Sequence, residues 1–155
     1  GHALVAHLML LLDASSETAV AIDAKPVPSA DRLAEILVSH WPRLESRVER
    51  RVGDLATAEL GGGDLAVSVH ACGVLSDTVL DRAIDARSVV ALLPCCHDAE
   101  TCDTGGLTGF LSIPLAVDAT RVARLRAAGY DVFTQTIPAE ITPENRLILA
   151  VPAGD

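Results

Sequence analysis

Two clusters of histidine and cysteine residues follow neighbouring apolar segments of this chain. The group HACG, from His70 to Gly73, ends the run DLAVSV, and the group PCCH, from Pro94 to His97, ends the run SVVALL. An imidazole can lower the pKa of a nearby thiol and so create a nucleophilic thiolate, and both side chains are also good zinc ligands. A third interpretation is the rim of a small-molecule pocket, formed where the strands of a sheet end.

A zinc site would need the CCH group, Cys95 to His97, together with Cys102. Structural zinc sites commonly separate their cysteines by about two to four residues, whereas the two cysteines of this group are adjacent. A fourth ligand from His70 would require a contact that the sequence does not reveal. We therefore predict no metal site, and we expect at least two of the three cysteines in the HACG and CCH groups to be small packing residues.

Two acidic residues stand at the ends of predicted strands. Asp23 closes the β-branched run TAVAIDA, where a carboxylate can accept hydrogen bonds from both hydroxyls of a nucleoside ribose. It can equally cap a turn. Asp54 follows Gly53 and can contact an adenine amino group, although an N-cap for the segment LATAEL explains it as well. Both interpretations stay open for both residues.

Hydrophobic patterning predicts strands that alternate with helices along most of the chain. Strands are expected at residues 18–24, 48–52, 64–73 and 88–94, and two more strand-like runs end the chain. A Gly-rich loop is expected at residues 98–109. The alternation predicts an α/β fold, with a mostly parallel sheet and a C-terminal antiparallel hairpin.

Helices are expected in four segments between these strands. They cover residues 3–12, a segment with Ser29 as N-cap, a segment with Ser76 as N-cap, and residues 116–128 before Gly129. Residues 3–12 are almost wholly apolar, so we expect this helix to be buried on most of its sides.

The composition limits the classes of function. A chain of 155 residues that is 50% hydrophobic has the size of one globular domain, so we predict a single domain over residues 1–155. Its formal net charge of -9 argues against a direct nucleic-acid surface, because such surfaces depend on Lys and Arg. Four cysteines are too few for a disulfide scaffold, which favours a reducing cytoplasm. The apolar N-terminal run is too short to span a membrane, and no membrane partner is expected.

The motifs also occur in an order that is similar to that of a known family. The chain contains, in sequence, VAIDAKP, VGDL, AVSVHACGVLSD, VVALLPCCH and ITPENRLILA. This set resembles the class I S-adenosylmethionine-dependent methyltransferases, and within them a subgroup with HxCG and CCH motifs. The subgroup includes a tRNA ribose methyltransferase family and the methyltransferase-like domain of glutathione S-transferase C-terminal-domain-containing proteins. The resemblance implies a Rossmann-like sheet that binds S-adenosylmethionine.

The resemblance also implies roles for individual residues. Gly1 would be the last glycine of a loop that wraps the cofactor, Asp23 would bind the ribose, and Asp54 with Leu55 would contact the adenine. The methionine end of the cofactor would be lined by His70, Ala71, Cys72 and Gly73. The methyl acceptor would face Pro94, Cys95, Cys96 and His97. His97 or His70 would act as the catalytic base for a hydroxyl or amine acceptor.

The chain departs from this family at its N-terminus, where the first strand and most of the glycine loop are missing. That strand belongs in the middle of the sheet, so we expect either a fragment of a longer protein or a partner that fills the gap. Two unpaired strand edges would favour self-association into homo-oligomers. The function expected is methyl transfer to an unidentified acceptor: RNA through a missing region, a protein or a small molecule. The alternatives are an inactive interaction module of the same fold, or a zinc or thiol site at the CCH cluster.

Overall fold

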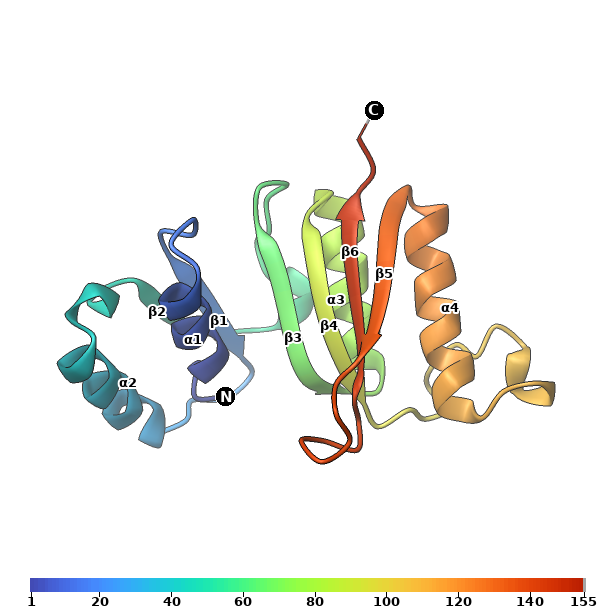
Figure 1. Ribbon diagram of the computed structural model, residues 1–155, viewed down its shortest axis with the longest axis horizontal. Helices are drawn as coiled ribbons and strands as arrows, with labels where there is room; N and C mark the ends of the chain where they lie inside the picture. The colour runs from blue at the N-terminus through green and yellow to red at the C-terminus, as the bar shows by residue number, and fades with distance from the viewer. Residues whose placement is uncertain (155) are drawn as a thin grey trace. The chain divides into compact units, whose positions relative to one another are not determined.

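The computed structural model describes residues 1–154, which form two compact units (Figure 1). The first unit comprises Gly1–Ala58 and the second begins at Glu59. Each unit contains its own β-sheet, with two strands in the first and four in the second. The predicted α/β class is confirmed, while the prediction of a single domain stays a prediction.

The first unit has two helices and a two-stranded parallel sheet. Its main elements are α1 (Leu4–Leu12), β1 (Ala19–Asp23), α2 (Ser29–His40) and β2 (Val48–Val52). The two strands run in register from the Ala19 and Val48 pair to the Asp23 and Val52 pair. Short 3-10 helices follow at Pro42–Leu44 and Leu55–Thr57. The core of this unit is a cluster of Leu10, Leu37 and Leu44.

Two predictions for the helices of the first unit are wrong. Helix α1 is not buried on most sides: Leu8 is 42% exposed and Leu12 is 87% exposed, because the helix packs mainly against β1 and the 42–44 turn. Ser29 is not the N-cap of α2 but its first residue, after Pro28. Its hydroxyl is within hydrogen-bond distance of His2 Nε2, at 2.7 Å, and is not used as a cap.

The second unit has a four-stranded sheet in the order β3-β4-β6-β5. Its elements are β3 (Leu65–Cys72), α3 (Val74–Ala86), β4 (Val89–Cys95), α4 (Ile113–Ala127), β5 (Tyr130–Thr136) and β6 (Arg146–Pro152). Strands β3 and β4 are parallel, whereas β6 pairs antiparallel with both β4 and β5. The expected C-terminal antiparallel hairpin is therefore confirmed. The apolar run of β4 supplies the centre of the core, where Val90 and Leu92 are fully buried.

The two helices of the second unit begin earlier than predicted. Helix α3 begins at Val74 after Gly73, and Ser76 lies in its first turn, where its buried hydroxyl donates to the Ala71 carbonyl oxygen at 2.7 Å. Helix α4 begins at Ile113, with Pro near its start, which suits a residue that needs no amide partner there. The predicted C-terminal glycine is confirmed, since Gly129 follows α4 with φ of 81°.

Both sheets have an open edge within the described residues. Strand β1 pairs only with β2, and β3 pairs only with β4. Strands β2 and β5 are edge strands as well, since a sheet that does not close into a barrel has two open edges.

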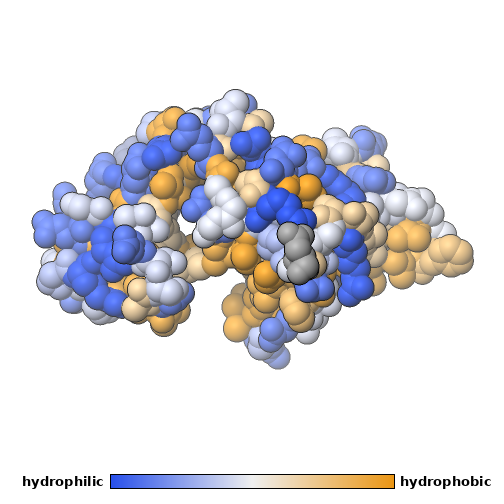
Figure 2. Space-filling view, turned by 90° about the horizontal axis from the view of Figure 1, so that it is seen from above, coloured by the Kyte–Doolittle hydropathy of each residue, from blue (hydrophilic) through white to orange (hydrophobic). Residues whose placement is uncertain are grey.

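Apolar side chains are also exposed on the second unit. Figure 2 shows hydrophobic colour at the end of this unit where the segment before α4 lies. Phe110 is 89% exposed there, and Ile113 and Leu115 are 41% and 44% exposed. Among residues 1–154, no helix combines the length and the hydropathy that crossing a membrane would require.

Candidate functional site

The two cysteine-containing groups lie at the ends of adjacent parallel strands. The carboxyl ends of parallel neighbours lie at the same edge of a sheet, and here Cys72 of β3 is the register partner of Cys95 of β4. Their sulfur atoms are 3.6 Å apart. Cys96 belongs to the same group, since its Sγ atom lies within 4.8 Å of the other two. The HACG and CCH groups therefore share one edge of the sheet of the second unit.

The backbone is irregular at both strand ends. His70 and Cys96 have positive φ values of 59° and 52°, in the left-handed region that residues with a Cβ rarely adopt. The register of the β3 and β4 pair shifts between Val69 and Cys72. Gly73 also has a positive φ, of 54°, so a side chain there would be strained. Such conformations cost about 1–3 kcal/mol each and gather at functional sites.

The surroundings of this edge raise the pKa values of two of its thiols, Cys95 and Cys96. Burial, together with the hydrogen bonds to Cys72 and Cys96, raises the pKa of Cys95 to about 12. The pKa of Cys96 is also raised, mainly by its hydrogen bond with Cys72. An activated cysteine nucleophile requires the opposite, a lowered pKa. The environment of these two cysteines does not favour nucleophilic catalysis at neutral pH.

His97 points into a buried group of charged side chains. Its ring is 2% exposed, and its Nε2 atom lies 2.8 Å from Oδ1 of Asp118. Its Nδ1 atom lies 3.8 Å from Oε2 of Glu144. Asp118 also accepts hydrogen bonds from Arg121, at 3.3 Å, and from Arg146, at 2.7 Å. These contacts fix the orientation of the imidazole ring.

Arg121 is at the centre of this network. It is 1% exposed, and its Nη2 atom donates to Asp77 at 2.7 Å and to the Gly73 carbonyl oxygen at 3.0 Å. Burial works to lower the pKa of Arg121, but the hydrogen bond to Asp77 and the charges of Asp77 and Asp118 raise it overall, so the guanidinium stays charged. The bond to Gly73 ties α4 to the end of β3.

The sequence alone does not predict this network. The sequence signal was the spacing of Asp118 and Arg121, three residues apart on a predicted helix, which places them on one helical face. Nothing in the sequence relates that pair to Asp77 or to Arg146.

The predicted adenosine-binding residues all lie in the first unit. Gly1 and Asp23 are neighbours: the amine of Gly1 forms an ion pair with the Asp23 carboxylate, whose side chain is 42% exposed. The other carboxylate oxygen of Asp23 accepts a hydrogen bond from the Lys25 amide at 3.0 Å. Asp54 caps the 3-10 turn that begins at Leu55, since its Oδ1 atom accepts from the Ala56 amide at 2.9 Å. The capping interpretation of Asp54 is thus observed.

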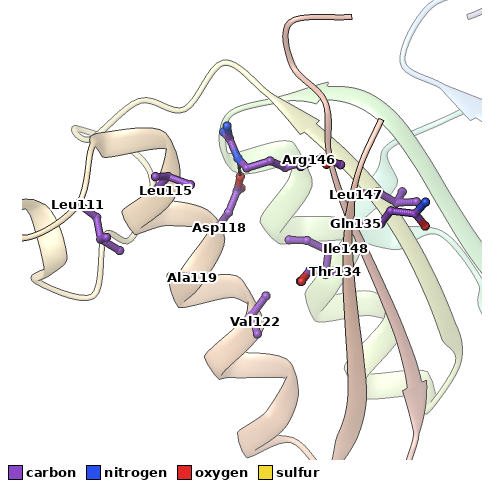
Figure 3. A pocket seen from close by; sticks show the side chains of 11 residues that line it. Leu111, Leu115, Asp118, Ala119, Val122, Thr134, Gln135, Arg146, Leu147 and Ile148 are labelled. Atoms are coloured by element: carbon purple, nitrogen blue, oxygen red, sulfur yellow. Dashed lines mark hydrogen bonds and ion pairs between the residues drawn. The ribbon is translucent and has the colours of Figure 1, made fainter. Parts of the chain in front are cut away.

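A cavity of about 570 Å³ lies between α4 and the β5–β6 hairpin (Figure 3). Apolar side chains make up most of its wall, including Leu115, Val122 and Ile148. The ion pair between Asp118 and Arg146 also lies in the wall, as the dashed line in Figure 3 indicates. The cysteine groups do not line this cavity, and no motif of the sequence predicts it.

Comparisons with known proteins agree on the fold. No protein-family model matches the chain. The crystal structure of the S-adenosylmethionine-dependent methyltransferase SibL in its apo form is similar over 100% of this chain and 48% of its own, with a TM-score of 0.57 and 19% identity. A protein of Corynebacterium glutamicum is similar over 98% of this chain and 82% of its own, with a TM-score of 0.56 and 16% identity.

One curated sequence matches a short part of the chain. It is a glutathione S-transferase C-terminal domain-containing protein of Xenopus laevis, 46% identical over 37 residues, which are 24% of this chain and 6% of that protein. The chain thus spans a small part of this relative and about half of SibL. These likenesses show the fold alone, a Rossmann-like α/β architecture similar to that of SibL.

Proposed function

We propose that this chain binds S-adenosylmethionine and transfers its methyl group to an acceptor. The observation that carries this proposal is the structural likeness to an S-adenosylmethionine-dependent methyltransferase over the whole length of the chain. The parallel strands with polar residues at their carboxyl ends support it, because ligands of such sheets bind outside those ends.

The residues at the end of β1 fit the adenosine part of the cofactor. Asp23 offers a partly exposed carboxylate, which can accept hydrogen bonds from the two ribose hydroxyls. Gly1 lies beside this carboxylate, since its amine pairs with Oδ2 of Asp23. We assign the ribose to Asp23 and the adenine to Asp54 and Leu55.

We assign the methionine end of the cofactor and the acceptor to the second unit, at the HACG and PCCH groups. The bound cofactor supplies an electrophilic methyl group, and the acceptor's heteroatom forms the new bond while S-adenosylhomocysteine leaves. The proton of a hydroxyl or amine acceptor passes to a base, and this base must lie within hydrogen-bond distance of the acceptor. His70 is exposed, whereas the ring of His97 is buried against Asp118, so His70 is the better placed of the two.

The class of acceptor stays open among RNA, a protein and a small molecule. The charge of -9 implies that an RNA acceptor would depend on residues outside this chain. We propose a reducing compartment such as the cytoplasm, which suits the four cysteines, all of them free in the described structure. The open edges of β1 and β3 support self-association.

Calorimetry with the 155-residue chain tests the proposal. We expect binding of S-adenosylmethionine and S-adenosylhomocysteine, and a loss of at least about tenfold in affinity on Asp23→Ala, because a hydrogen bond to a charged group is worth about 1.5–3 kcal/mol. Asp31→Ala is the matched control, an exposed acid of the same unit that pairs with Arg50. Equal loss of affinity in both variants, or none in either, would contradict the assignment of the ribose.

The alternative function is an interaction module that has the fold without the activity. The exposed apolar side of α1 favours this candidate. A chain that binds neither form of the cofactor but associates with itself or with an extended peptide would support it over methyl transfer.

A further inference from the structure

Three cysteine side chains converge at the end of β3 and β4. The Sγ atoms of Cys72, Cys95 and Cys96 all lie within 4.8 Å of one another. The pair from Cys72 and Cys95 is 3.6 Å apart, which exceeds the S–S bond length of about 2.05 Å, so both are free thiols. Sulfur ligands that share a tetrahedral ion with bonds of about 2.3 Å are separated by a similar distance, under 4 Å.

The local backbone explains how adjacent cysteines reach the same point. In a regular strand, Cys95 and Cys96 would point to opposite faces of the sheet. The left-handed conformation of Cys96, with φ of 52°, interrupts that alternation at the strand end. On the neighbouring strand, the register shift between Val69 and Cys72 re-aims the Cys72 side chain, as bulges do. The irregular backbone of both strands thus brings the three sulfur atoms together.

The two other candidates for this ion, His97 and Cys102, are occupied elsewhere. The His97 ring is held by Asp118, and Cys102 is buried beside Nη2 of Arg121, at 3.8 Å. Among the described residues, the group that could hold a metal is the three cysteines. The set of ligands considered from the sequence alone for the CCH group was different and did not include Cys72. Cys72 lies 23 positions before Cys95 along the chain, and only the fold brings the two together.

We propose that Cys72, Cys95 and Cys96 form a binding site for a thiolate-preferring metal ion of the zinc type. Three thiolates and an open fourth position are the ligand number of a zinc site that keeps one place for solvent or an external ligand. Cys72 and Cys96 are exposed, so an ion has access, while Cys95 forms the buried side of the site. Glu144 adds negative charge near Cys96. The ion displaces one proton from each thiol that it binds.

The three cysteines belong to the HACG and PCCH groups, to which we also assign the methionine end and the acceptor, but this inference does not rest on methyl transfer and its test does not measure activity. The 155-residue chain is reduced with a phosphine, freed of metal with a chelator and titrated with Co²⁺. We expect sulfur-to-cobalt charge-transfer absorption in the near ultraviolet that saturates at one equivalent and is abolished by Zn²⁺. Cys72→Ser and Cys96→Ser should each weaken Co²⁺ binding by more than about 100-fold, because even outer contacts of a metal site are worth about 10–100-fold.

Cys102→Ser is the matched control, because this cysteine lies outside the cluster; its titration should equal that of the unchanged chain. Far-ultraviolet circular dichroism checks the folding of each variant, and Cys72 and Cys96 are exposed enough for their variants to fold. Absence of the charge-transfer band, or a band that survives Cys72→Ser, overturns the proposal. So does a chain whose mass and thiol count, before reduction, reveal a disulfide between Cys72 and Cys95 that prevents metal uptake.

Discussion

The sheet of the first unit has two strands and the sheet of the second has four. The core of the first unit also contains fewer buried apolar residues than the core of the second. The buried apolar residues of the first unit are Leu10, Ala30, Leu37 and Leu44. Those of the second include Leu80, Val90, Leu92, Val117, Leu125 and Ile148, all 2% exposed or less. A sheet usually needs three or more strands with a packed face for independent stability. We therefore expect the first unit to unfold more easily.

The chain carries one natural probe in each unit. Trp41, its single tryptophan, lies in the first unit, and Tyr130, its single tyrosine, lies in the second. Urea unfolding followed by tryptophan fluorescence therefore reports the first unit, and near-ultraviolet circular dichroism in a Trp41→Phe background, where no tryptophan overlaps the tyrosine signal, reports the second.

The largest effect is expected for Arg121→Met in the second unit. The change removes the buried guanidinium that pairs with Asp77 and Asp118. The carboxylates of these residues are only 14% and 9% exposed, so water cannot replace the lost partner fully. Breaking a buried ion pair in this way costs about 3–5 kcal/mol of unfolding free energy. The tyrosine transition should shift to lower urea. Arg126→Met, an exposed position on the same helix, is the control, and a loss below about 1 kcal/mol for Arg121→Met would contradict the role of the network.

For Leu10→Ala we expect a similar loss of unfolding free energy, seen only by the tryptophan of the first unit. Leu10 is 1% exposed, and large-to-small changes of this kind cost about 2–5 kcal/mol. Because the core of the first unit has few members, the tryptophan transition should move most. Leu8→Ala, at a position 42% exposed on the same helix, should cost less than about 1 kcal/mol. If Leu10→Ala shifts the tryptophan and tyrosine transitions equally, the two units unfold together. That result would contradict the expectation that the first unit unfolds more easily.

The smallest effect is a pH dependence of the second unit. Burial raises the pKa of Tyr130, while the guanidinium of Arg87 above its ring has the opposite, lesser influence. The folded state then holds this proton more tightly than the unfolded state, whose tyrosine has a pKa of about 10. The stabilisation is therefore complete below pH of about 10 and is lost as the pH rises through the higher folded value.

Absorbance titration of Tyr130 in the folded chain should give a midpoint above that of free tyrosine. Tyr130→Phe should cost about 1 kcal/mol, since the hydroxyl donates to the Ala83 carbonyl oxygen at 2.7 Å. The variant should also lose this part of the alkaline decline in stability. A midpoint equal to that of free tyrosine would indicate that the ring is not buried in solution.

The strands were predictable because β-branched and apolar residues favour a strand through their local sequence alone. The β-branched and apolar runs before Asp23, Cys72 and Cys95 mark strands whatever surrounds them, and the alternation with helices predicts parallel pairing. The helix starts were less predictable. Ser29 and Ser76 have the side chains of N-caps, but their hydroxyls are engaged by His2 and by the Ala71 carbonyl, which only the folded chain brings near.

The site was predictable as far as strand ends could indicate it. That HACG and CCH meet follows from two adjacent parallel strands. The orientation of each side chain does not, because it depends on left-handed backbone at His70 and Cys96, which the residue types do not suggest. The burial of His97 depends on Asp118, an acid 21 positions away along the chain. Long-range charge pairing of this kind leaves no periodic signal in a sequence.

One carboxylate connects the cavity beside α4 to the cysteine edge of the sheet. Asp118 binds Arg146 through one oxygen, in the cavity wall, and His97 through the other. A small molecule in the cavity that competes for Arg146 would change the charge that His97 experiences. By thermodynamic linkage the effect is mutual, so a ligand or ion that alters the neighbours of His97 would change the affinity of the cavity by the same factor.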